Sequence, residues 1–146
     1  MSIDHGFTHV ALMVSDLDRT IAFYAKYAEM KVVHQRADGT SRTRVAWLSD
    51  RTRPFVIVCV ELPRWVPRFV LRAAKGLFSF EHLGVGCASR EDVDRLSAEA
   101  AREGCLRRPP MDSGPPVGYW SFLADPDGNT LELSYGQEVG ITVATA

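Results

Sequence analysis

The sequence predicts an α+β fold of two βαβββ modules that form a cupped mixed sheet with the helices outside. Two observations predict the modules: an apolar strand, a helix-capping residue and an amphipathic helix occur twice in that order, and three strand-like runs follow each helix. A third predicts the cup. A single module would leave one sheet face uncovered, so the second must curl against it.

The first module begins with an apolar strand over residues 7–14. Ser15 and Asp16 follow, and both are residue types that cap helix N-termini. The next residues place apolar side chains at helical spacing, which predicts a helix. Turn-forming residues then separate three predicted strands, over residues 31–35, 44–48 and 55–62.

The second module repeats this order from residue 80. Residues 80–87 predict a strand, Ser89 with Asp92 resembles a capping box, and Gly104 ends the helix that follows. The last three strands are expected over residues 105–108, 119–123 and 129–135, with D-P-D-G as the final turn.

The predicted organisation is therefore a first module over 1–62, a linker over 63–79, a second module over 80–136 and a tail over 137–146. The linker mixes arginines with aromatic residues and predicts a short amphipathic helix. Residues 106–118 hold four prolines and predict a structured, non-helical rim that covers the binding pocket.

Composition favours a small-molecule partner. The chain has 17 basic and 18 acidic residues, so it has no broad positive field for nucleic acid or an anionic membrane. It has no apolar run of the roughly 20 residues that a membrane span needs, and its start lacks signal-peptide features, so we expect a cytoplasmic protein. Three cysteines without a C-x-x-C pair are expected as reduced thiols.

His9, His82 and Glu132 each lie at the centre of a predicted strand, on its less apolar face. Opposite His9, for example, the strand carries an apolar row that ends in Leu12 and Val14. Two imidazoles and one carboxylate suit catalytic iron(II), manganese or zinc better than a closed structural site. Glu132 between two leucines would also be costly to bury without a partner, which favours a metal ligand.

Three segments resemble the vicinal oxygen chelate superfamily, which includes glyoxalase I, extradiol dioxygenases and fosfomycin-resistance thiol transferases. They are H-V-A-L-M-V-S-D-L-D-R-T-I-A-F-Y, F-E-H-L-G-V-G and D-P-D-G-N-T-L-E-L, within a resemblance over about residues 5–136. The resemblance implies paired modules around a divalent metal held by His9, His82 and Glu132. It implies Fe(II) first, with Mn, Ni or Zn as alternatives, and a homodimer.

The sequence departs from each branch of this superfamily. Glyoxalase I takes a fourth ligand, a glutamate that also serves as base, from the last strand of its first module; here Val58 stands there, with Glu61 as a weaker candidate. The thiol transferases have a threonine where this chain has Ala11. Both they and the dioxygenases have a tyrosine where this chain has Phe122. The dioxygenases, moreover, have a histidine shortly before His82 that this chain lacks.

Because two histidines and one glutamate leave metal positions open for substrate and dioxygen, an extradiol-type dioxygenase is the first hypothesis. A glyoxalase-like lyase or thiol transferase is the second. A metal-free protein that binds an antibiotic or another small molecule is the third.

The pocket is expected to have an apolar wall that suits an aromatic or hydrophobic substrate with adjacent oxygens. Tyr119 is the candidate catalytic residue, and Arg44 or Arg107 is expected to orient the substrate. The expected wall consists of Ala11, Met13, Val58, Val60, Gly84, Phe122 and either Trp47 or Trp120.

Overall fold

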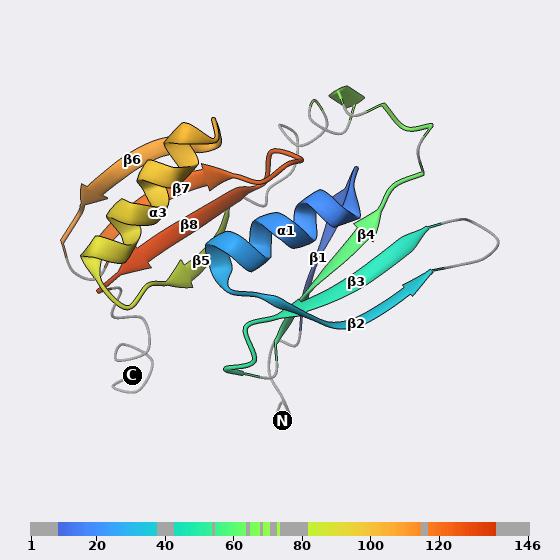
Figure 1. Ribbon diagram of the computed structural model, residues 1–146, viewed down its shortest axis with the longest axis horizontal. Helices are drawn as coiled ribbons and strands as arrows, with labels where there is room; N and C mark the ends of the chain where they lie inside the picture. The colour runs from blue at the N-terminus through green and yellow to red at the C-terminus, as the bar shows by residue number, and fades with distance from the viewer. Residues whose placement is uncertain are drawn as a thin grey trace, which may run out of the picture. The chain divides into compact units, whose positions relative to one another are not determined.

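The structure is a computed structural model of residues 1–146 (Figure 1). It describes residues 9–37, 43–53, 55–63, 65–67, 69–70, 73, 82–114 and 117–136, and the side chains from Val10 onward. The chain divides into two compact units, Met1–Leu77 and Phe78–Ala146. The boundary falls within the predicted linker, and most of that linker and the tail over 137–146 lie outside the described residues.

Unit 1 contains sheet A and one helix, α1. The strand order in sheet A is β1-β4-β3-β2, with β1 parallel to β4 and the other pairs antiparallel. The elements are β1 His9–Val14, α1 Leu17–Ala28, β2 Lys31–Ala37, β3 Arg44–Ser49 and β4 Val56–Glu61.

The core of unit 1 lies between α1 and one face of sheet A. Asp16 caps the helix by accepting a hydrogen bond from the Arg19 N–H, as the sequence predicts for this residue type. The residues buried between helix and sheet are apolar and alternate along the strands; they include Leu12, Val14, Leu17, Tyr24, Leu48, Ile57 and Cys59. The predicted packing of Leu12 and Val14 under a helix is confirmed.

Unit 2 repeats this arrangement in sheet B. Its strand order is β5-β8-β7-β6, with β5 parallel to β8. Ser89 caps α3, and the helix buries Ser97, whose hydroxyl lies 2.7 Å from that of Ser121 in the sheet. The elements are β5 His82–Gly86, α3 Arg90–Arg102, β6 Leu106–Asp112, β7 Tyr119–Ala124 and β8 Thr130–Tyr135.

The strand expected over residues 105–108 is longer than predicted, because β6 continues to Asp112 and includes Pro109 and Pro110. The described part of the predicted rim, residues 106–114 and 117–118, is non-helical as expected. β6 is an edge strand, where a missing N–H donor is tolerated. Its pairing with β7 shifts by one residue between Arg108 and Met111, so the two prolines lie at a β-bulge.

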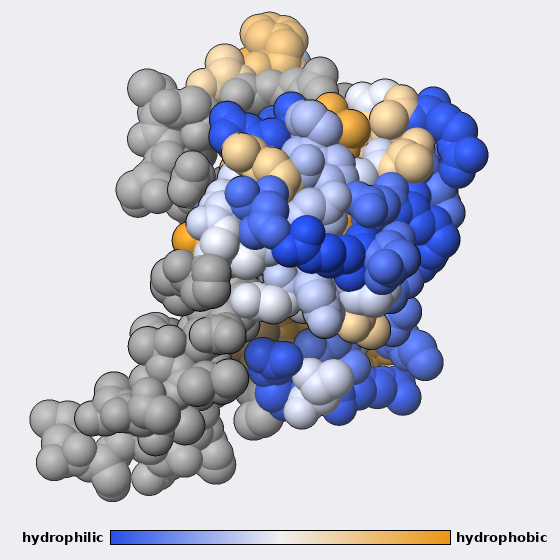
Figure 2. Space-filling model, turned by 90° about the vertical axis from the view of Figure 1, so that its left-hand side faces the viewer, coloured by the Kyte–Doolittle hydropathy of each residue, from blue (hydrophilic) through white to orange (hydrophobic). Residues whose placement is uncertain are grey.

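Both units thus have the order βαβββ and a mixed sheet with a helix on one face, which confirms the predicted α+β class of two βαβββ modules. The side of unit 2 that carries β6 and the outer face of α3 is mostly hydrophilic, as expected for the solvent face of an amphipathic helix (Figure 2). Among the described residues, no helix is long and apolar enough to cross a membrane.

Candidate metal centre

His82 and Glu132 lie together on the face of sheet B opposite α3. The parallel pairing of β5 with β8 places Gly84 beside Glu132, and His82 pairs with Thr130 two pairs earlier, on the same face. Leu131 and Leu133 are fully buried beneath the helix, so alternation turns Glu132 to the other face. His82 Nε2 lies 3.2 Å from Glu132 Oε2. The structure therefore brings two of the three predicted ligands together.

The Glu132 carboxylate is buried but has open space beside it. Only 5% of Glu132 is exposed, and the His82 side chain is 33% exposed. A Cβ added at Gly84 or Gly86 would meet no heavy atom within 4 Å. Because β5 carries glycines at these positions, room for a ligand remains next to the carboxylate.

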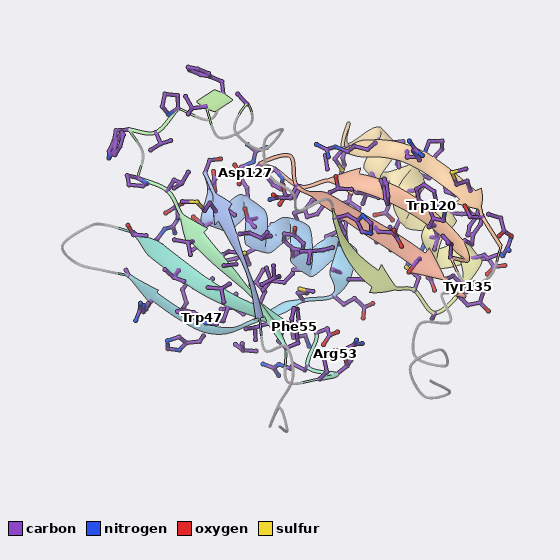
Figure 3. The ribbon with its side chains drawn as sticks, turned by 180° about the vertical axis from the view of Figure 1, so that it is seen from behind. Trp47, Arg53, Phe55, Trp120, Asp127 and Tyr135 are labelled. Carbon is purple, nitrogen blue, oxygen red and sulfur yellow. The ribbon has the colours of Figure 1, made fainter. Side chains whose placement is uncertain are left out.

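Two aromatic residues of β7 form a wall next to this pair. Phe122 pairs with Glu132 across β7 and β8, and its ring centroid lies 5.3 Å from that of His82. Trp120, labelled in Figure 3, packs on Phe122 with ring centroids 4.6 Å apart and donates its indole N–H to Ser113. The guanidinium of Arg108 lies over both rings, at 5.5 Å from Trp120 and 5.9 Å from Phe122.

The turn between β7 and β8 sets the register of Phe122 against Glu132. The Asp125 carboxylate accepts hydrogen bonds from the backbone N–H groups of Asp127 and Asn129 and from the Asn129 side chain. Gly128 has φ of 86°, a conformation that glycine adopts without steric cost. The D-P-D-G turn expected from the sequence is present.

In unit 1, Val58 lies on the face of sheet A opposite α1. Ile57 and Cys59 are buried on the helix face, and Val58 pairs with Ala11 and Trp47. The backbone of His9 pairs with Val56 at the start of β1, but its side chain lies outside the described part of the structure.

His9 therefore stays a predicted ligand. Among the described side chains, no group of three or more His, Cys, Asp or Glu residues is arranged to hold a metal ion.

Glu61 and Arg44 form an ion pair on the helix face, opposite Val58. Glu61 accepts the N–H of Leu17 at the start of α1, and it accepts Arg44 Nε and Nη2 at 2.7 and 2.8 Å. Arg44 also binds Asp18 on the helix at 3.1 Å. The hydrogen bond to Glu61, and then the one to Asp18, raise the pKa of Arg44. The structure gives both residues a role in joining helix to sheet that sequence reasoning did not find.

Tyr119 lies on the opposite face of sheet B from Glu132. Its hydroxyl donates to Asp94 of α3 at 2.5 Å, and its ring lies 4.6 Å from the Arg90 guanidinium. The hydrogen bond to Asp94 raises the pKa of Tyr119. Within unit 2, the structure does not bring this predicted catalytic residue to His82 and Glu132.

Arg107, the other residue expected to orient a substrate, binds the β7–β8 turn. Its guanidinium donates to the Thr130 hydroxyl and to the Gly128 carbonyl. These contacts tie β6 to the end of the neighbouring hairpin.

Comparison with known proteins gives one family model, the Glyoxalase/Bleomycin resistance protein/Dioxygenase superfamily, which matches residues 6–133. An uncharacterized Pseudomonas aeruginosa protein is 38% identical over 133 residues, which are 91% of this chain and 90% of that protein. A lactoylglutathione lyase of Arabidopsis thaliana is 33% identical over 137 residues, with 87% of this chain covered. The match spans only 43% of the plant protein.

Solved structures show the same fold. A fosfomycin resistance protein of Listeria monocytogenes, complexed with Mn(II) and 1S,2S-dihydroxypropylphosphonic acid, matches with TM-score 0.67 and 21% identity over 97% of this chain and 99% of its own. Glyoxalase I of Zea mays matches with TM-score 0.65 and 22% identity over 87% of this chain and 43% of its own.

Proposed function

Because the chain belongs to the Glyoxalase/Bleomycin resistance protein/Dioxygenase superfamily, we propose that it is a divalent-metal-dependent enzyme acting on a small substrate with two adjacent oxygen atoms. The observation that carries the proposal is the 3.2 Å contact between His82 and the buried Glu132 carboxylate. In this proposal His82 and Glu132 are two metal ligands, and His9 is the third. A homodimer remains part of the proposal.

The donor set of unit 2 fits a divalent metal. A neutral imidazole nitrogen and a carboxylate oxygen are ligands that iron(II), manganese, nickel and zinc accept, with Fe(II) first among them for a dioxygenase. A cation at this place would also offset the cost of burying the carboxylate. When bound, the metal would supply Lewis-acid stabilisation of negative charge on the substrate oxygens.

The surrounding residues would hold and shield the substrate. The Phe122 ring packs beside His82 and limits how far that imidazole can rotate. Trp120 and Phe122 would shield one side of the substrate from water, while the glycines of β5 leave space on the other. Such a site suits a substrate with an apolar or aromatic body.

A glyoxalase-like lyase is the reaction that the curated relatives favour, since two of them are lactoylglutathione lyases, one of them putative. In such a reaction a base must remove a proton next to a carbonyl group. Val58 has no basic atom, so Glu132 would take this proton.

An extradiol-type dioxygenase is the second candidate reaction. The observation that favours it is Val58 itself, because a side chain without a donor atom leaves a further metal position for dioxygen or substrate.

Metal content of purified variants tests the metal site. We expect about one Fe, Mn, Ni or Zn per chain in the parent protein and at least a roughly ten-fold weaker affinity in His9→Ala, His82→Ala and Glu132→Gln. Glu91→Gln, on the exposed first turn of α3, is the matched control and should keep the metal. A parent protein that binds none of the four metals would instead be a metal-free binding protein.

Two assays on the loaded protein separate the reactions. Formation or consumption of lactoylglutathione identifies the lyase. Oxygen uptake with a catechol panel, after anaerobic loading with iron(II), identifies the dioxygenase. Full iron occupancy without oxygen uptake from any catechol would remove the dioxygenase candidate.

A further inference from the structure

We propose that the face of sheet A opposite α1 carries a carboxylate-binding subsite, in which Arg36 binds the anion and Trp47 is its platform. The subsite deepens the proposed function, on which it rests, by naming the substrate class: small apolar or aromatic carboxylic acids. Arg36 is then a specificity-determining residue that sequence reasoning did not single out.

A β-bulge turns Arg36 to this face. Val32 pairs with Leu48, which is buried under α1, but the next pair joins His34 to Trp47. The pairing of β2 with β3 therefore shifts by one residue between Val32 and His34. A one-residue shift moves the following side chains to the other face of a sheet, and bulges often re-aim side chains next to functional sites.

Trp47 orders the guanidinium of Arg36. Trp47 is labelled on sheet A in Figure 3. The guanidinium carbon of Arg36 lies 5.8 Å from the Trp47 ring centroid, and the His34 ring packs against the same indole at 4.9 Å and 60°. A guanidinium that stacks on an aromatic face keeps the N–H donors at the edge of the guanidinium plane available. Two of these donors match the two oxygens of a carboxylate.

The cation is available to a ligand. Arg36 is exposed, and within the described ranges it forms no ion pair with an acidic side chain. Arg44, by contrast, is bound on two sides by Asp18 and Glu61. A charged, ordered and accessible arginine on the face that carries Val58 has no described structural partner other than the Trp47 ring.

The subsite is continuous with the apolar row of this face. Trp47 pairs with Val58, and Val58 pairs with Ala11 on β1, the strand that begins with His9. Neighbouring strands lie about 4.8 Å apart, so the ring that carries Arg36 is about 10 Å from β1. An aromatic acid of that length would place its carboxylate on Arg36 and its apolar body along Trp47 and Val58.

Unit 2 also has an arginine over an aromatic ring. Its edge strand β6 also bulges, and Arg108 lies over Trp120 and Phe122 of the neighbouring strand. The repetition indicates that an arginine ordered on an aromatic ring is a feature of the module. Arg108 shares its face with the Glu132 carboxylate, whereas the described part of the Arg36 face has no acidic side chain, so an anionic ligand meets less repulsion at Arg36.

The test is a pair of probes that differ only in charge, 3-phenylpropionate and 3-phenylpropionamide, added to the full chain without metal. The reporter is the indole N–H of Trp47 in ¹H–¹⁵N NMR spectra, assigned with Trp47→Phe. We expect saturable shifts with the acid and none with the amide. Arg36→Met should weaken binding of the acid at least five-fold, and Arg36→Lys should retain part of it.

Arg53→Met is the matched control, because Arg53 is an exposed arginine of the same unit and should leave the affinity unchanged. Equal binding of acid and amide, parent-like affinity in Arg36→Met, or no binding of the acid would each overturn the subsite. Metal content is measured separately, because the metal site tests the proposed function and not the subsite. Arg36→Met should keep the parent's metal. Acid binding through Arg36 in a protein that binds no metal would leave the subsite standing and overturn the metalloenzyme.

Discussion

Arg44→Met should destabilise unit 1 by about 3 kcal/mol, because it removes the ion pairs that join α1 to sheet A. The Glu61 side chain is only 14% exposed and loses two short charge-assisted hydrogen bonds, each worth about 1.5 kcal/mol. Asp18 is 72% exposed, so its contribution is near zero. For a chain of this size, a loss of about 3 kcal/mol lowers Tm by about 6–12 °C.

Denaturant and thermal unfolding measure this loss, with Arg53→Met as the control. Arg53 lies 3.8 Å from Asp50 and is 70% exposed, so its replacement should change the free energy of unfolding by no more than about 0.5 kcal/mol. A double-mutant cycle with Glu61→Gln should give a coupling energy of about 2 kcal/mol. An Arg44→Met protein as stable as the parent, or a cycle without coupling, would refute this role for Arg44.

Two further predictions concern unit 2. Arg90→Met should raise the pKa of Asp112, which the Gly114 N–H and then Arg90 hold below its usual value; carboxyl NMR titration measures the change. A carboxyl group whose pKa is lowered by folding stabilises the fold at pH above its pKa in the unfolded chain, and this stability is lost as pH falls through its pKa in the folded protein. The variant should therefore lose less stability than the parent when the pH is lowered through this range. Gly118→Ala should cost more than about 2 kcal/mol in denaturant unfolding, because its Cβ would lie 2.5 Å from the Tyr135 carbonyl oxygen at φ +79°. Gly114→Ala, with a similar φ and open space, should cost only the backbone strain of about 1–2 kcal/mol, and equal losses would contradict the clash.

The order of elements could be predicted from the sequence because local signals agree with the fold. The capping residues Asp16 and Ser89 begin the two helices where expected, and strand alternation buries Leu12 and Leu131 beneath them. Such signals act within a few residues, so a sequence displays them directly.

Alternation could also have placed Tyr119 correctly. Tyr119 is three residues before Phe122 on the same strand, so the two side chains point to opposite faces, and only one can share a face with Glu132. Expecting both in one pocket was inconsistent with a regular strand.

The arginines could not be placed from the sequence. The positions of Arg36 and Arg108 depend on bulges, which change the face of every following residue and have no clear local signal at Val33. The role of Arg44 depends on Glu61, a residue 17 positions away that pairing of β3 with β4 brings near. Long-range pairing of this kind has to be seen in a structure.

The two modules differ at the position that decides the reaction. Glu132 pairs with Gly84 on the parallel strand and with Phe122 on the antiparallel one, and Val58 has the equivalent pairs in unit 1, Ala11 and Trp47. One module therefore offers a carboxylate where the other offers an isopropyl group.

Val58→Glu tests whether this difference selects the chemistry. A glutamate there would supply the missing fourth ligand and second base, so metal affinity should rise at least ten-fold and any lyase activity should increase. Without metal, the half-buried carboxylate should lower the free energy of unfolding by about 1–3 kcal/mol. Added metal should restore this stability, because it binds preferentially to the folded state. Dioxygenase activity should fall instead, since a metal position is lost. Val45→Glu is the control for a carboxylate elsewhere in unit 1, because Val45 lies on β3, on the same face of sheet A as Val58. Unchanged metal affinity in Val58→Glu would show that this position does not contact the metal.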